Sequence, residues 1–153
     1  MRENIGLYRG KPKTSEDYFF FSQNWKNNCE EGFVYGNLIV SKGKYYICVS
    51  AMGKLNCCIN NGTVSMIEVI PETVGEYTGL TDKNGKKIFE GDVMEFEAYW
   101  LLYRGVVTIE GGNTGVFCKI GSPFLDDAIK HHNAVKIGNI HDNPELLKGG
   151  AEE

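Results

Sequence analysis

The sequence contains no apolar run of the roughly 20 residues that a membrane-spanning helix requires, which argues against a helical membrane protein. Residues 1–4 lead directly into mixed polar and aromatic residues, so the apolar core of a secretory signal is also missing there. Both absences predict a cytoplasmic protein without membrane association.

Cysteine is scarce and irregularly placed, with five residues and none of the spaced pairs typical of a structural zinc site. An odd number of cysteines without an export signal predicts free thiols rather than a disulfide framework. Cys57 and Cys58 are adjacent, so on a strand they would point to opposite faces. The sequence therefore predicts no metal site and no cofactor.

Nucleotide-binding fingerprints are also absent. Gly75, Gly79, Gly85 and Gly91 do not have the spacing of a dinucleotide or phosphate-binding loop, and no Gly-Lys-Ser/Thr ending follows them. These glycines are therefore expected to serve turns.

The C-terminal half of the chain has too few basic residues to balance its acidic ones. Residues 1–75 hold 8 Lys and Arg against 7 Asp and Glu, whereas residues 76–153 hold 8 against 13, giving +1 and -5 and the net charge of -4. An acidic half is a poor electrostatic match for a phosphate backbone, which disfavours nucleic acid as a partner.

Glycine, in contrast, is abundant: 19 in 153 residues, well above the usual fraction of about 7%. Glycines allow the positive φ of tight turns, so their number predicts many short strands and a mainly β, β-rich α+β fold. A chain of this length predicts one domain or two small subdomains that share a core. Strands are predicted at 5–8, 33–40, 45–49, 63–70, 93–98, 105–109, 115–120 and 134–140.

A short helix is predicted after Ser122, which would be its N-cap, with Pro123 in the first helical position. The aromatic run 18–21 is continuous rather than periodic and predicts a strand covered on both faces, or a packed loop. The buried stripe of the short helix would consist of Phe124, Leu125, Ala128 and Ile129.

Residues 71–92 carry a distinctive pattern of two turns around a short apolar pair, and this segment resembles the YopX family of bacteriophage and prophage proteins. Residues 9–11, 32–36 and 137–147 also fit the pattern of that family, in order along the chain. Residues 19–28 and 56–62 depart from it.

The resemblance implies a small phage or prophage protein in the cytoplasm of a bacterial host, but no mechanism. It also implies that the C-terminal part is an SH3-like barrel, which would carry the short helix and follow the N-terminal antiparallel strands. We therefore expect a β-rich subdomain at 1–75, the barrel at 76–147 and a flexible tail at 148–153.

Some residue types could support chemistry. Glu90, Asp92, Glu95 and Glu97 could form an acid/base pair or a divalent cation site, although Glu95 and Glu97 also fit the solvated face of an alternating strand. His131 fits a helix C-terminus better than a metal site. These observations carry no catalytic signature, and we expect no enzyme activity.

A candidate interaction patch consists of Tyr99, Trp100, Tyr103 and Arg104. Its aromatic residues suit stacking on unpaired bases or contact with a protein, and the run 100–103 also suits a core. The first hypothesis is a non-enzymatic phage accessory protein that binds a protein partner or itself, through this patch or exposed sheet edges. The alternatives are a nucleic-acid-binding protein and a metal-dependent hydrolase using some of Glu90, Asp92, His131 and His141.

Overall fold

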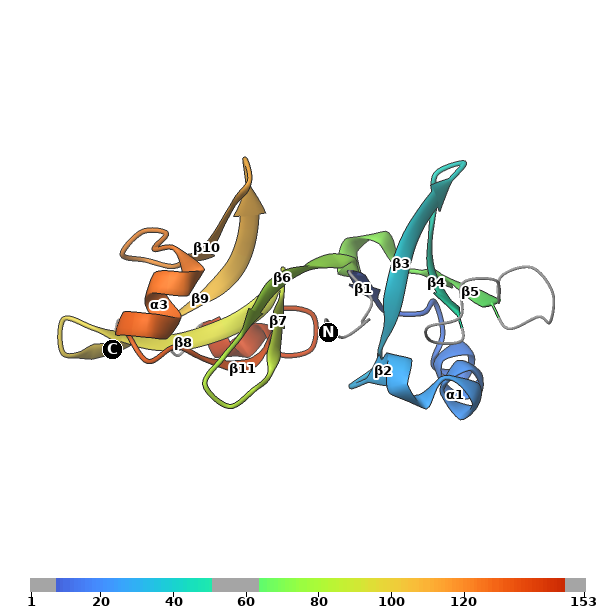
Figure 1. Ribbon diagram of the computed structural model, residues 1–153, viewed down its shortest axis with the longest axis horizontal. Helices are drawn as coiled ribbons and strands as arrows, with labels where there is room; N and C mark the ends of the chain where they lie inside the picture. The colour runs from blue at the N-terminus through green and yellow to red at the C-terminus, as the bar shows by residue number, and fades with distance from the viewer. Residues whose placement is uncertain (1–7, 51–63, 148–153) are drawn as a thin grey trace. The chain divides into compact units, whose positions relative to one another are not determined.

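A computed structural model describes residues 8–50 and 64–147 of the chain (Figure 1). The predicted mainly β fold is confirmed. The chain divides into two compact units, Met1–Glu76 and Tyr77–Glu153. No helix among the described residues is long and apolar enough to cross a membrane.

The first unit is built on an antiparallel sheet in the order β5-β4-β3-β1, with β2 paired to β3 and the start of β6 paired to β1. The sheet curls, because Pro12 forms a bridge to Val69 and the Ile70 amide donates to the Lys11 carbonyl at 2.8 Å. Its elements are β1 (Tyr8–Gly10), α1 (Ser15–Asn24), a 3₁₀ turn (Lys26–Asn28), β2 (Cys29–Glu30), β3 (Phe33–Ser41), β4 (Lys44–Ser50), β5 (Val64–Val69), a 3₁₀ turn (Pro71–Thr73) and the first residues of β6 (Gly75–Thr81).

The predictions for the first unit had mixed outcomes. The strands at 33–40, 45–49 and 63–70 are confirmed as β3, β4 and β5. The prediction of a strand or loop at 18–21 was wrong, because these residues lie in α1. The strand predicted at 5–8 begins among residues outside the described part of the chain. The stretch 56–62 lies wholly outside it.

Interactions between residues close in sequence stabilise helix α1. The Thr14 hydroxyl caps the helix by accepting a hydrogen bond from the Asp17 amide at 3.0 Å. Glu16 and Asp17 place negative charge in the first turn, where the helix dipole favours it. Phe21 then anchors the helix, since it is buried in the core cluster of this unit and lies 6.4 Å from Trp25 between ring centroids.

The second unit contains a four-stranded antiparallel sheet in the order β10-β9-β8-β11, beside a hairpin in which β6 pairs with β7. Helix α3 packs on one face of this sheet and closes a separate core that includes Phe96, Tyr103 and Leu125 (Figure 1). The SH3-like barrel implied for this unit stays a prediction. The elements are β7 (Lys87–Phe89), β8 (Asp92–Ala98), β9 (Leu101–Glu110), β10 (Asn113–Phe117), α3 (Leu125–His131), β11 (Val135–Asn139) and a 3₁₀ turn (Pro144–Leu147).

The short helix was predicted to begin too early. Phe124, not Ser122, is the N-cap residue. Phe124 is still extended and forms a bridge to Gly115 of β10, and the Val116 amide donates to the Pro123 carbonyl at 2.9 Å. Phe124 is 53% exposed and was wrongly placed in the buried stripe, whereas Leu125 and Ala128 are fully buried.

Candidate interaction site

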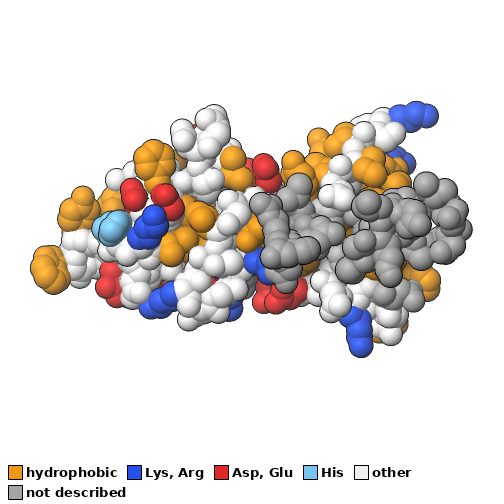
Figure 2. Space-filling model, viewed as in Figure 1, with side chains coloured by type: hydrophobic (Ala, Val, Ile, Leu, Met, Phe, Trp, Pro, Cys, Tyr) orange, Lys and Arg blue, Asp and Glu red, His pale blue; other side chains and the backbone are white. Residues whose placement is uncertain are grey.

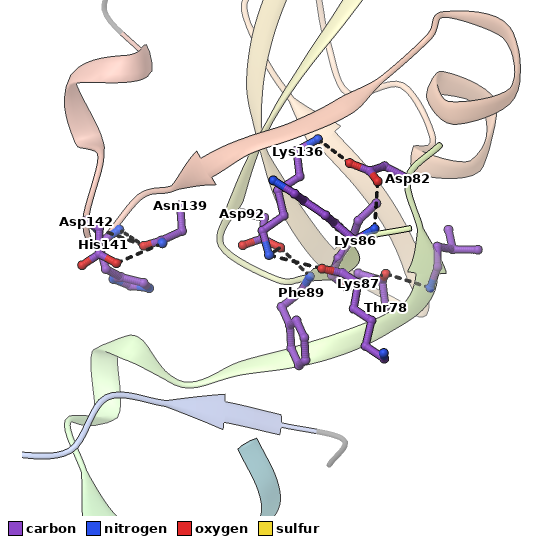
Figure 3. A network of polar contacts seen from close by, with 12 residues as sticks. Thr78, Asp82, Lys86, Lys87, Phe89, Asp92, Lys136, Asn139, His141 and Asp142 are labelled. Carbon is purple, nitrogen blue, oxygen red and sulfur yellow. Dashed lines mark hydrogen bonds and ion pairs between the residues drawn. The ribbon is translucent and has the colours of Figure 1, made fainter. Parts of the chain in front are cut away.

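The carboxylates of the distinctive segment 71–92 hold its backbone in place. Asp82 is buried and accepts three amide hydrogen bonds: Asn84 at 2.9 Å and Lys86 at 3.0 Å on Oδ1, and Lys136 at 3.0 Å on Oδ2 (Figure 3). The first two bonds shape the turn, and the third fixes it to β11. The sequence pointed to a turn here but not to its tie to β11.

Asp92, a candidate for acid/base chemistry, is fully buried and engaged in structural contacts. Its Oδ2 accepts a hydrogen bond from the Phe89 amide at 2.7 Å and lies 3.2 Å from Lys136 Nζ. The same ammonium group donates to the Lys87 carbonyl at 3.2 Å. Lys136 therefore joins β11 to the turn between β6 and β7 by its backbone amide, and to β7 and the first residue of β8 by its side chain (Figure 3).

The remaining acidic and histidine candidates are not gathered into a site. Glu97 is exposed on β8, Glu90 is half-buried, and His131 is exposed at the end of α3. His141 lies in a turn in which its amide donates to Asn139 Oδ1 at 2.9 Å. Within residues 8–50 and 64–147, no group of three or more His, Cys, Asp and Glu side chains could hold a metal ion.

Among the thiols of the described residues, Cys29 offers little reactivity. Cys29 and Cys118 are free thiols, and Cys118 packs against the core of the second unit. Burial raises the pKa of Cys29 to about 11, so this thiol stays protonated near neutral pH. A protonated thiol is a poor nucleophile.

Two residues of the predicted patch belong to the body of the second unit. Tyr103 is 8% exposed and stacks on Phe96, with 5.9 Å between ring centroids. The Arg104 guanidinium forms an ion pair with Glu95 at 3.1 Å and donates to the Leu146 carbonyl at 3.0 Å. Both side chains are thus occupied by the fold.

The other two residues, Tyr99 and Trp100, form the two-residue turn between β8 and β9, closed by the pairing of Ala98 with Leu101. Their φ angles are 51° and 70°, and positive φ at both central positions is the signature of a type I′ turn. Tyr99 is 78% exposed and Trp100 is 100% exposed. With Leu101 and Leu102, each about half exposed, they make up what we call the hairpin tip, an apolar end visible at the left edge of Figure 2.

A family model described as YopX protein matches residues 8–148 of the chain. The chain belongs to the YopX family. This confirms the resemblance and indicates a phage-type protein. No curated protein gives a significant match.

The YopX match includes the whole of segment 71–92, whose buried aspartates Asp82 and Asp92 are both bound to backbone amides. Segment 71–92 of this YopX chain therefore has a structural role, and the candidate binding residues lie outside it. Sequence reasoning selected Tyr99 and Trp100 but missed their left-handed backbone. Their position between two strand-like runs could have indicated a two-residue hairpin turn of this type, in which Asn-Gly is the usual residue pair.

Proposed function

We propose that this YopX protein is a non-enzymatic accessory protein that binds a partner protein by inserting the hairpin tip into an apolar pocket. The observation that carries the proposal is the combination of left-handed backbone and full exposure at Trp100. The left-handed turn suits the hairpin, but Tyr and Trp are costly residues in it, and their exposed rings add no burial to the unit.

The energetic argument concerns the turn. A residue other than glycine in the left-handed region costs about 1–3 kcal/mol, and Tyr99 and Trp100 each carry this cost. Burial of the rings would offset it, but Tyr99 and Trp100 are the two most exposed large hydrophobic side chains among the described residues. The offset is therefore expected from a partner, and Trp and Tyr are the residues that most often dominate binding energy at interfaces.

The hairpin beneath the tip is well supported. Phe96 and Tyr103 stack across β8 and β9 behind the tip. The Phe96 and His132 rings also pack edge to face, with 6.4 Å between their centroids. The Glu97 amide donates to the His132 carbonyl at 2.9 Å, which ties β8 to the end of α3. A tip held this way loses little conformational entropy on binding.

Nucleic-acid binding remains the second candidate, because exposed aromatic rings also stack on unpaired bases. Exposed Glu97 lies on the strand that leads into the tip, and its charge would repel a phosphate backbone. This arrangement favours a protein partner over a nucleic acid.

The test replaces the turn by its preferred residues. The double variant Tyr99→Asn/Trp100→Gly preserves the I′ geometry and removes both rings. Immobilised wild-type protein should retain a bacterial protein that the variant does not retain, and light scattering of both proteins shows whether the retained partner is a second copy. Equal retention by both would contradict the proposal, and salt-sensitive binding of single-stranded DNA by the wild type alone would support the second candidate instead.

A further inference from the structure

Helix α1 has an apolar surface that its own unit leaves uncovered. Phe19 is 65% exposed and Phe20 is 72% exposed, although the neighbouring Phe21 is 6% exposed. Phe21 and Trp25 pack on the inner side of the helix and thereby fix which side faces outward. Exposed large apolar side chains that lie together can form an interaction surface.

Polar residues complete this surface. Glu16 precedes Phe19 by three positions and Phe20 by four, and Gln23 follows them by four and three, so all four side chains are neighbours on the helix. Glu16 and Gln23 are both exposed. We call these four residues the α1 face.

The charge of α1 restricts what can cover the α1 face. The helix contains two charged residues, Glu16 and Asp17, and both are acidic. Lys13 before the helix is paired with Glu68 at 3.5 Å, and exposed Lys26 follows its C-terminal end, so the charge directly beside the two phenyl rings is that of Glu16. An acidic side chain beside two phenyl rings matches apolar side chains accompanied by Lys or Arg and disfavours a phosphate.

We infer that the α1 face docks a basic amphipathic segment of a partner protein. The side chains of such a segment would bury both phenyl rings while a cation approaches Glu16. This surface is independent of the hairpin tip, since it lies in the other unit, so the protein would have two separate binding surfaces.

The test uses a fluorescent helical peptide of leucine and lysine and a matched peptide of leucine and glutamate, both titrated with the full chain. The lysine peptide should bind, and the glutamate peptide should bind more weakly. In Phe19→Ser/Phe20→Ser the affinity should fall at least about tenfold, as expected for two hot-spot residues. In Glu16→Gln it should fall about twofold to threefold, the scale of an exposed ion pair.

Val40→Ala is the matched control, because Val40 is a 54% exposed apolar residue of the same unit outside α1. It should leave peptide affinity unchanged. The helical circular dichroism of each variant is recorded, and the single variants Phe19→Ser and Phe20→Ser replace the double one if its helix is lost. The inference is overturned if the lysine peptide fails to bind, if both peptides bind alike, if removing the phenyl rings leaves affinity intact, or if anionic lipid vesicles bind in preference to the peptide.

Discussion

Lys136 Nζ lies 3.2 Å from Oδ2 of the fully buried Asp92, and this ion pair joins β11 to the first residue of β8. Removing one member of such a pair leaves an uncompensated charge in the interior. We therefore predict that Lys136→Met lowers the free energy of unfolding by about 3 kcal/mol, measured by urea titration. Lys136→Met/Asp92→Asn should recover part of that loss, and a double variant as unstable as the single one would contradict this account.

Asp82 gives a second stability prediction. Asp82→Ala removes the acceptor of three amide hydrogen bonds, so we expect a loss of about 2–4 kcal/mol in unfolding free energy. Asp82→Asn keeps one oxygen acceptor and should cost clearly less. If both variants melt at the temperature of the wild type, the turn does not depend on this side chain.

Most of the longer strands were predictable because alternation is a local property, but β6 (Gly75–Thr81) was missed, and the strand predicted at 115–120 is β10 at Asn113–Phe117. Met94 and Phe96 are buried and Glu97 on the opposite face is exposed, as the pattern of 93–98 predicted, but Val93 on that opposite face is fully buried. Helix α1 was missed because the continuous aromatic run has no period, and the deciding signal was the Thr14 cap.

In the candidate site, too, local features were predictable from the sequence and distant contacts were not. Exposure of Trp100 follows from its place in a two-residue turn, which is a local feature. Burial of Tyr103 depends on stacking with Phe96 across the hairpin, and the bond from Arg104 to Leu146 depends on how the chain returns to β9. Contacts between residues far apart in the chain do not follow from the spacing of residues in the sequence. The sequence therefore could not show which residues of the patch are exposed and which are held by the fold.

The turn itself gives a third prediction. Tyr99→Asn/Trp100→Gly should raise the free energy of unfolding by about 1–3 kcal/mol, because Asn and Gly occupy left-handed backbone at lower cost. Trp100→Ala serves as the control, since it removes the ring without relieving the backbone and should not stabilise the protein. A double variant that is less stable than the wild type would show that the rings support the fold.

Cys29 gives a pH-dependent prediction. Burial raises its pKa from 9.0 to about 11, so between these values the unfolded chain loses the thiol proton while the folded chain keeps it. Stability from this group is complete below pH 9.0 and is lost as the pH rises toward about 11. The unfolding free energy of the wild type minus that of Cys29→Ala should therefore decrease over this range, and a constant difference would argue against a buried thiol.

The central claim, that the hairpin tip is the anchor for a partner protein, is tested most directly by the affinity of the retained partner for two single variants. Trp100→Ala should weaken binding by at least about tenfold, as for a hot-spot residue. Phe117→Ala removes a 63% exposed ring from the same unit outside the tip and should leave the affinity within about twofold. Equal affinities of Trp100→Ala and the wild-type protein would contradict the claim.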